Sequence, residues 1–118
     1  MPGKEYYFEK IESEFASAHE ALKIGNEGRA RVCARRAVGH AIEWFLTKFP
    51  GEGWGTDAMT RLVRLREDKG FPEDIHEAAA RLTARVSGQF THPYKINPEE
   101  DARIIVDYVR KMMDDGSH

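Results

Sequence analysis

The sequence predicts an all-α protein, an antiparallel bundle of about five helices. In five separate stretches, apolar residues recur at spacings of three and four, which is the pattern of a helix with one buried face. Glycine and proline separate these stretches. No stretch alternates apolar and polar residues convincingly, as a half-buried strand would. Short loops between such helices favour antiparallel neighbours.

The composition fits a single domain over residues 1–118. Of its 118 residues, 41% are hydrophobic and 32% are charged. This is enough apolar material for one core and too much for a disordered chain. No window approaches the roughly 18 apolar residues of a membrane span, and the first residues do not resemble a signal peptide. A single cysteine, Cys33, cannot form an internal disulfide. We therefore expect a cytoplasmic protein that does not contact a membrane.

The first two expected helices are long. One runs from about Lys4 to Lys23, and Gly25 with Asn26 ends it. The next runs from about Glu27 to Lys48, with Asn26 as its cap. Its first half is lined with alanine, so that a neighbouring helix can approach closely. We expect this second helix to be the central one.

Three further helices are expected after a glycine-rich loop. Thr56 is expected to cap the third, which carries Met59, Leu62 and Val63. The fourth starts with Pro72 at its first position and ends near Gly88. The fifth starts at Asn97-Pro98, with acids in its first turn, and residues 114–118 form a frayed tail. The residues expected in the core are Ile11, Phe15, Ala34, Ala37, Ala41, Phe45, Leu82, Val86, Ile105 and Val109.

The charge is nearly balanced overall but uneven along the chain. The formal net charge is −2, which provides no general attraction for nucleic acid. Between Gly28 and His40, however, the chain contains four arginines and no acid. Either these arginines are solvated on a helix surface, or they form local basic surface. The candidate binding residues are Arg29, Arg35 and Arg36.

Most catalytic and metal-binding patterns do not occur in this chain. The glycines around Trp54 follow no strand and match no phosphate-binding loop. No zinc-ligand pattern is present. Glu73 and His76 form one Glu-x-x-His sequence, whereas carboxylate di-metal bundles need two. Cys33 lies on a largely buried helical face and is interpreted as a core residue. We therefore expect neither a metal nor a cofactor.

Two segments resemble the HEPN family of small prokaryotic helical proteins. The run from Gly28 to His40 is similar to the second helix of that family. The run from Ala80 to Arg85, with the loop and the helix from Asn97, is similar to the end of the domain. The resemblance implies a bundle of four or five helices that usually dimerises. Active members are metal-independent endoribonucleases with an Arg–His motif of four to six intervening residues. Others serve as binding or partner modules, and members are often paired with nucleotidyltransferase proteins.

The first candidate pair for that motif is Arg85 and His92, with six residues between them. It falls between the fourth and fifth expected helices, where the family motif lies, and Gly88 would allow the chain to turn. The histidine could exchange protons with a ribose hydroxyl or the leaving oxygen, and the arginine could hold the phosphate. Val86 follows the arginine, however, where active members carry a polar residue.

The second candidate lies on the second helix. Arg35 and His40 have the family's spacing, with four residues between them. A helical wheel places their side chains about 140° apart. Arg36 and His40 share a face but lack that spacing. Because Arg29 and Glu43 lie on the same flank, a surface row of ion pairs is the alternative.

The sequence thus leads to two functional hypotheses. The favoured one is a HEPN-like module without catalysis that binds a nucleotide, RNA or a protein partner, in a setting related to toxin–antitoxin pairs. The alternative is a metal-independent endoribonuclease. We also expect a homodimer, both from the resemblance and because a bundle this small has limited room for its aromatic residues. The aromatic candidates for surface that needs a partner are Tyr6, Tyr7, Trp44 and Trp54.

Overall fold

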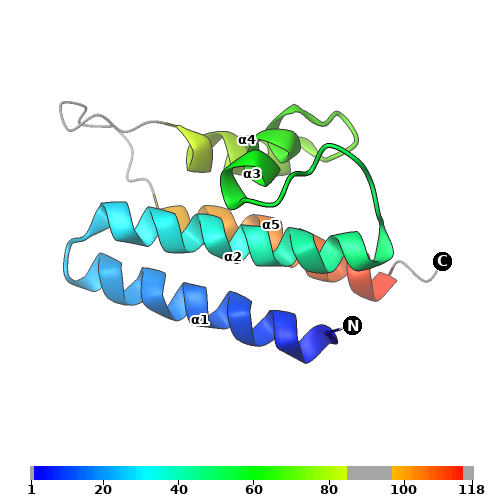
Figure 1. The fold of residues 1–118 in the computed structure, drawn as a ribbon. Coiled ribbons are helices and arrows are strands. Elements are labelled where there is room, and N and C mark those ends of the chain that lie inside the picture. Colours follow the sequence, from blue (N-terminus) through cyan, green and yellow to red (C-terminus); the bar gives the residue numbers. More distant parts are fainter. Residues whose placement is uncertain (1, 85–96, 116–118) are drawn as a thin grey trace.

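A computed structural model describes residues 2–84 and 97–115, and these residues form five helices and no strand (Figure 1). Helices α1 (Lys4–Lys23) and α2 (Glu27–Lys48) form an antiparallel pair. Helix α5 (Pro98–Asp115) packs against α2, and the short helices α3 (Ala58–Glu67) and α4 (Glu73–Thr83) cover another side of α2 and α5. The prediction of an all-α bundle is confirmed.

The bounds of α1 and α2 are those expected from the sequence. Gly25, with φ at +79°, allows the turn between them. The Asn26 side chain then caps α2 by accepting a hydrogen bond from the backbone N–H of Arg29 at 3.1 Å. The start of α5 is also confirmed, because the Asn97 side chain accepts from the N–H groups of Glu99 and Glu100. Helix α5 continues to Asp115, which includes the first two residues of the expected tail.

The cap of α3 differs from the prediction, because Asp57 and not Thr56 occupies that position. The Asp57 carboxylate accepts from both the backbone N–H and the hydroxyl of Thr60, each at 2.8 Å. These hydrogen bonds lower the pKa of the Asp57 carboxyl. The buried residues of α3 are Leu62 and Leu65, whereas Met59 is 39% exposed.

Helix α4 is shorter than predicted. Pro72 is its N-cap, and the helix ends at Thr83 instead of near Gly88. Ala84 has extended backbone. The carbonyl of Leu82 accepts from the side chain of Arg35, and that of Ala84 accepts from the side chain of Arg31, both at 2.7 Å. The end of α4 is therefore fixed by contacts with α2, which local sequence does not reveal.

Helix α2 is central, as expected, and contacts each of the other four helices. Small side chains allow the close approach. At Gly39, a Cβ atom would lie 3.2 Å from the Cβ of Ala58, the first residue of α3. The other small buried residues of α2 are Ala30, Cys33, Ala34, Ala37 and Ala41.

The expected core residues are buried, except Val86, which lies outside the described residues. The expectation that four aromatic residues need a partner is wrong for three of them. Tyr7, Trp44 and Trp54 are at most 5% exposed within the single chain, whereas Tyr6 is 44% exposed. Trp54 is covered because the loop before α3 folds back onto an aromatic cluster of the core, formed with Phe45 and Phe71.

A buried ion pair links α4 to α5. Asp101 is only 6% exposed, and its carboxylate accepts a hydrogen bond from Arg81 Nε at 2.8 Å. Burial raises the pKa of this carboxyl, and the guanidinium of Arg81 offsets only part of that effect. Keeping this carboxylate ionised in the folded protein therefore costs desolvation free energy, and the attraction to Arg81 does not fully offset that cost.

We expect Gly39→Leu to destabilise the protein by about 1–3 kcal/mol or more, because the larger side chain would force α3 away from α2. Gly28→Leu is the matched control. It lies on the same helix, and the nearest atom to a Cβ added there would be the Asn26 side-chain oxygen, at 3.9 Å. Urea denaturation should show a large loss of stability for the first variant and none for the second. Equal unfolding free energies would contradict the close α2–α3 contact.

Asp101→Asn should change how the unfolding free energy depends on pH. A carboxyl whose pKa is raised by folding favours the folded state when protonated, so its contribution is lost as pH rises through the folded-state pKa. Asparagine does not ionise but still offers Arg81 an acceptor. The stability of the wild type minus that of the variant should therefore fall between acidic and neutral pH. Urea denaturation at several pH values measures this difference, and a rise would contradict the raised pKa.

Candidate functional site

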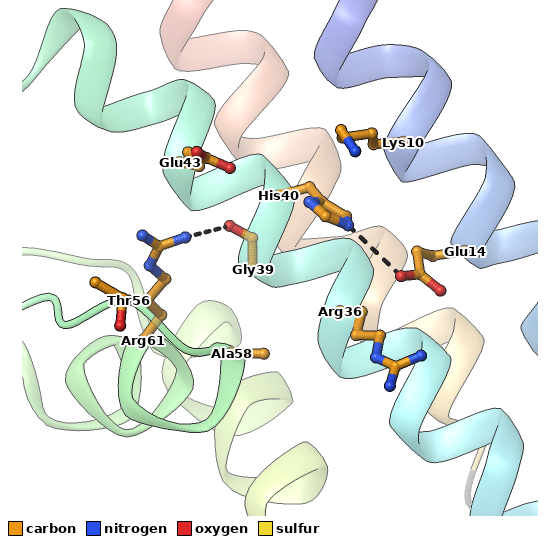
Figure 2. Close-up of a pocket in the computed structure, with 9 residues that line it drawn as sticks. All are labelled: Lys10, Glu14, Arg36, Gly39, His40, Glu43, Thr56, Ala58 and Arg61. Carbon is orange, nitrogen blue, oxygen red and sulfur yellow. Dashed lines mark hydrogen bonds and ion pairs between the residues drawn. The ribbon is translucent and has the colours of Figure 1, made fainter.

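An open pocket of about 460 Å³ lies between α1, α2 and the start of α3 (Figure 2). It contains three permanent cations and two carboxylates, so its lining is positive although the chain as a whole is negative. The lining residues are Lys10 and Glu14 of α1, Arg36, Gly39, His40 and Glu43 of α2, and Thr56, Ala58 and Arg61 around the start of α3.

Helix periodicity explains how the first two helices present these side chains. Lys10 and Glu14 are four residues apart on α1, as are Arg36 and His40 on α2, so each pair lies on one face. The third wall depends on Gly39, because its missing side chain lets α3 approach α2. The pocket is therefore the part of the α2 surface that remains open between α1 and α3.

His40 is held towards α1 by Glu14. The imidazole Nε2 lies 3.5 Å from a Glu14 carboxylate oxygen, and both side chains are largely covered. Figure 2 shows this contact spanning the gap between the two helices. When the imidazole is protonated, the contact is an ion pair. Glu14 thus fixes the position of the His40 imidazole in the pocket.

Arg61 is a fixed cation on the α3 side. Its guanidinium donates to the carbonyl of Gly39 at 2.9 Å and to that of Gly55 at 3.3 Å. Its Nε is buried and has no hydrogen-bond partner among the described residues. These contacts tie the loop before α3 to the middle of α2. Arg61 therefore supplies positive charge to the pocket from a defined position.

Lys10 and Arg36 are held less tightly. Within residues 2–84 and 97–115, neither forms an ion pair or a side-chain hydrogen bond. The Lys10 ammonium lies over the Tyr6 ring, 5.0 Å from its centre. Figure 2 shows the Arg36 guanidinium directed away from the imidazole of His40. The pocket thus combines two fixed groups with two long cationic side chains that can turn towards an anion.

Of the candidate Arg–His pairs, the structure describes those on α2. Arg85 and His92 lie outside the described residues. Arg35 and His40 point to different helices, since Arg35 donates to the carbonyl of Leu82 in α4 whereas His40 faces Glu14 in α1. The different directions of these two side chains agree with the angle of about 140° between them on a helical wheel. Arg36 and His40 line the same pocket, although their side chains diverge there.

The three candidate binding arginines lie on three different surfaces. Arg36 is in the pocket, and Arg35 is directed to the end of α4. Burial, followed by the nearby charge of Arg31, lowers the pKa of Arg35. Arg29 borders a separate open hollow near the α1–α2 turn, together with Glu20 and Ile24. The arginine-rich run therefore does not form one continuous basic face.

Sequence reasoning missed Lys10, Glu14 and Arg61. A weak signal existed for the first two, which are four residues apart on a face of α1 away from the core. Nothing in the sequence indicates that this face lies beside His40, or that Arg61 reaches α2. Among the described residues, no group of three or more His, Cys, Asp or Glu side chains could hold a metal ion. No helix in the described part of the chain is long and apolar enough to cross a membrane.

The chain matches no protein-family model, no curated protein and no solved structure.

Arg35→Met should destabilise the protein by roughly 1–3 kcal/mol, because it removes a charged donor from a carbonyl at the end of α4. Arg36→Met is the matched control and should change stability by no more than about 0.5 kcal/mol, since Arg36 is exposed and has no protein partner among the described residues. Chemical denaturation measures both. Similar losses would show that the capping contact of Arg35 does not stabilise the fold.

Proposed function

We propose that this protein is a HEPN-like helical domain acting in the cytoplasm as a binding or partner module without catalysis. We further propose that its pocket between α1, α2 and α3 holds phosphate groups of RNA or a nucleotide. The observation that carries this proposal is the pair of cations at the rim, Lys10 and Arg36. They come from neighbouring helices, and neither is paired with an acid among the described residues.

The electrostatics of the pocket support an anionic ligand. Glu14 already contacts His40, and Arg61 adds a fixed positive charge on the opposite wall. Guanidinium and ammonium groups form strong charge-assisted hydrogen bonds with phosphate oxygens. Because the net charge of the chain is −2, little long-range attraction reaches an incoming polyanion. Affinity should therefore depend on contacts inside the pocket.

A homodimer and a nucleotidyltransferase-type partner, as in toxin–antitoxin pairs, belong to the same proposal. Their support is the resemblance of the segment from Gly28 to His40 to HEPN proteins. The aromatic argument for a dimer is weaker than expected, because Tyr7, Trp44 and Trp54 are buried within one chain.

A metal-independent endoribonuclease is the second candidate function. Arg36 and His40 share the pocket, and Glu14 positions the imidazole. There His40 could exchange a proton with a ribose 2′-hydroxyl while Arg36 held the phosphate. The divergence of the two side chains favours binding over cleavage. The other candidate pair, Arg85 and His92, lies outside the described residues.

The double variant Lys10→Gln/Arg36→Gln should bind RNA more weakly than the wild type. For a single strand, the slope of log affinity against log salt should become shallower by about 0.7 for each phosphate that the variant no longer neutralises. Fluorescence anisotropy with a labelled RNA strand at several salt concentrations measures both effects. The matched control is Arg29→Gln/Arg66→Gln, which removes the same charge from exposed positions outside the pocket.

Equal reductions of affinity in the two double variants would contradict a specific site.

The same RNA, incubated with the wild type and a metal chelator, should remain intact. Chelator-resistant cleavage that is abolished in His40→Ala would instead establish the nuclease function at this pocket. Loss of cleavage in His92→Ala alone would assign it to the other candidate pair.

A further inference from the structure

Tyr6 is the exposed member of an aromatic pair at the start of α1. Its side chain is 44% exposed, whereas that of its neighbour Tyr7 is 3% exposed. The two rings meet edge to face, with centres 5.2 Å apart and planes at 87°. The Lys10 ammonium lies 5.0 Å from the centre of the Tyr6 ring. Tyr6 is thus supported by a buried residue while much of its ring remains open to solvent.

This aromatic pair lies beside the pocket. Lys10, which contacts the Tyr6 ring, also lines the pocket, and the two residues are one helical turn, about 6 Å, apart along α1. Glu43 provides an independent link. Burial, and next the carboxylate of Glu43, raise the pKa of the Tyr7 hydroxyl, so this pocket residue is close to the pair. Tyr6 is therefore in contact with Lys10, a lining residue, one turn of α1 from the pocket.

The chemistry of this arrangement matches a ligand with two parts. Lys10, Arg36 and Arg61 suit a phosphate, whereas an exposed ring suits another planar ring. Proteins that bind single-stranded nucleic acid combine cations that follow the backbone with aromatic side chains on which bases stack. A paired base within a duplex has its faces covered by its neighbours, so it cannot use such a ring.

We infer that Tyr6 is a stacking platform for an unpaired nucleobase whose phosphate is held in the adjoining pocket by Lys10, its neighbour one turn along α1. The ligand class is therefore a nucleotide or a single-stranded nucleic acid. On binding, the Lys10 ammonium turns from the Tyr6 ring to the phosphate and leaves the ring to the base. The Glu43 carboxylate, which also lines the pocket, can accept a hydrogen bond from a ribose hydroxyl. This inference rests on the proposed phosphate-binding function.

The test compares ligands that share phosphates but differ in their bases. Anisotropy or calorimetry measures binding of an oligoadenylate strand, an abasic strand of equal length, the corresponding duplex, and AMP. The proteins are the wild type, Tyr6→Leu and Tyr6→Phe. Ile24→Ala, which alters an apolar residue with 76% exposure away from the pocket, is the control. Thermal melts check that each variant is folded.

The wild type should prefer the base-bearing strand over the abasic one by about 5- to 150-fold, the range of one stacked base. Tyr6→Leu should lose most of that preference, whereas Tyr6→Phe and Ile24→Ala should keep it. If AMP binding shows the same dependence on Tyr6, a mononucleotide is sufficient as the ligand. If only the strand shows it, the ligand is single-stranded nucleic acid.

Two results would overturn the inference while leaving the phosphate site intact: equal binding of the base-bearing and abasic strands, or a preference that survives in Tyr6→Leu. If none of the four ligands binds, the proposed function fails, and the inference fails with it. The abasic strand therefore separates the failure of stacking from the failure of phosphate binding.

Discussion

The close packing of other helices against α2 is the constraint on which the rest of this structure depends. All four of the other helices contact α2, and its small residues allow this. One close approach is at Gly39, where the first residue of α3 occupies the space that a larger side chain would need. Interiors are packed too densely to absorb extra atoms there without displacement. The path of α3 is therefore set by the absence of one side chain on α2.

The same helix explains how the run of four arginines is used. Successive residues of an α-helix point about 100° apart, so neighbouring arginines face different surroundings. Arg31 and Arg35 share a face and donate to carbonyls at the end of α4, which lack partners within that helix. Arg36 is left to the pocket and Arg29 to another surface. A charge cluster in the sequence thus becomes two capping residues and two separate surface cations.

The sequence was enough to predict those helix ends that depend on contacts between residues close together in the chain. Asn26 and Asn97 cap their helices through their own side chains, so the starts of α2 and α5 were predictable. At α3, Thr56 and Asp57 are both good capping residues, and only the hydrogen bonds to Thr60 distinguish them. The end of α4 was not predictable, because the apolar spacing of Leu82 and Val86 continues the helical pattern. Arginines of α2, distant in sequence, bind the carbonyls where the helix ends.

The pocket was only partly predictable for the same reason. Arg36 and His40 could be paired from their spacing on one helix, but Glu14, Lys10 and Arg61 come from two other helices. Which residues meet depends on how α1 and α3 pack against α2. The burial of Tyr7, by contrast, follows from its place four residues before Ile11 on the buried face of α1, whereas Tyr6 lies about 100° away and is exposed.

The residues of the pocket differ in how firmly they are held, and this affects the free-energy cost of ordering them around the proposed ligand. His40 and Arg61 are held by Glu14 and by backbone carbonyls, so their positions require little further ordering. Lys10 and Arg36 must each lose rotamer freedom, at a cost of up to about 2 kcal/mol per side chain. A bare phosphate gives them few contacts in return. A ligand that adds stacking on Tyr6 gains free energy without ordering another long side chain, because the buried ring of Tyr7 already supports that tyrosine. Under the proposed function, a base joined to a phosphate should therefore bind more tightly than phosphate alone.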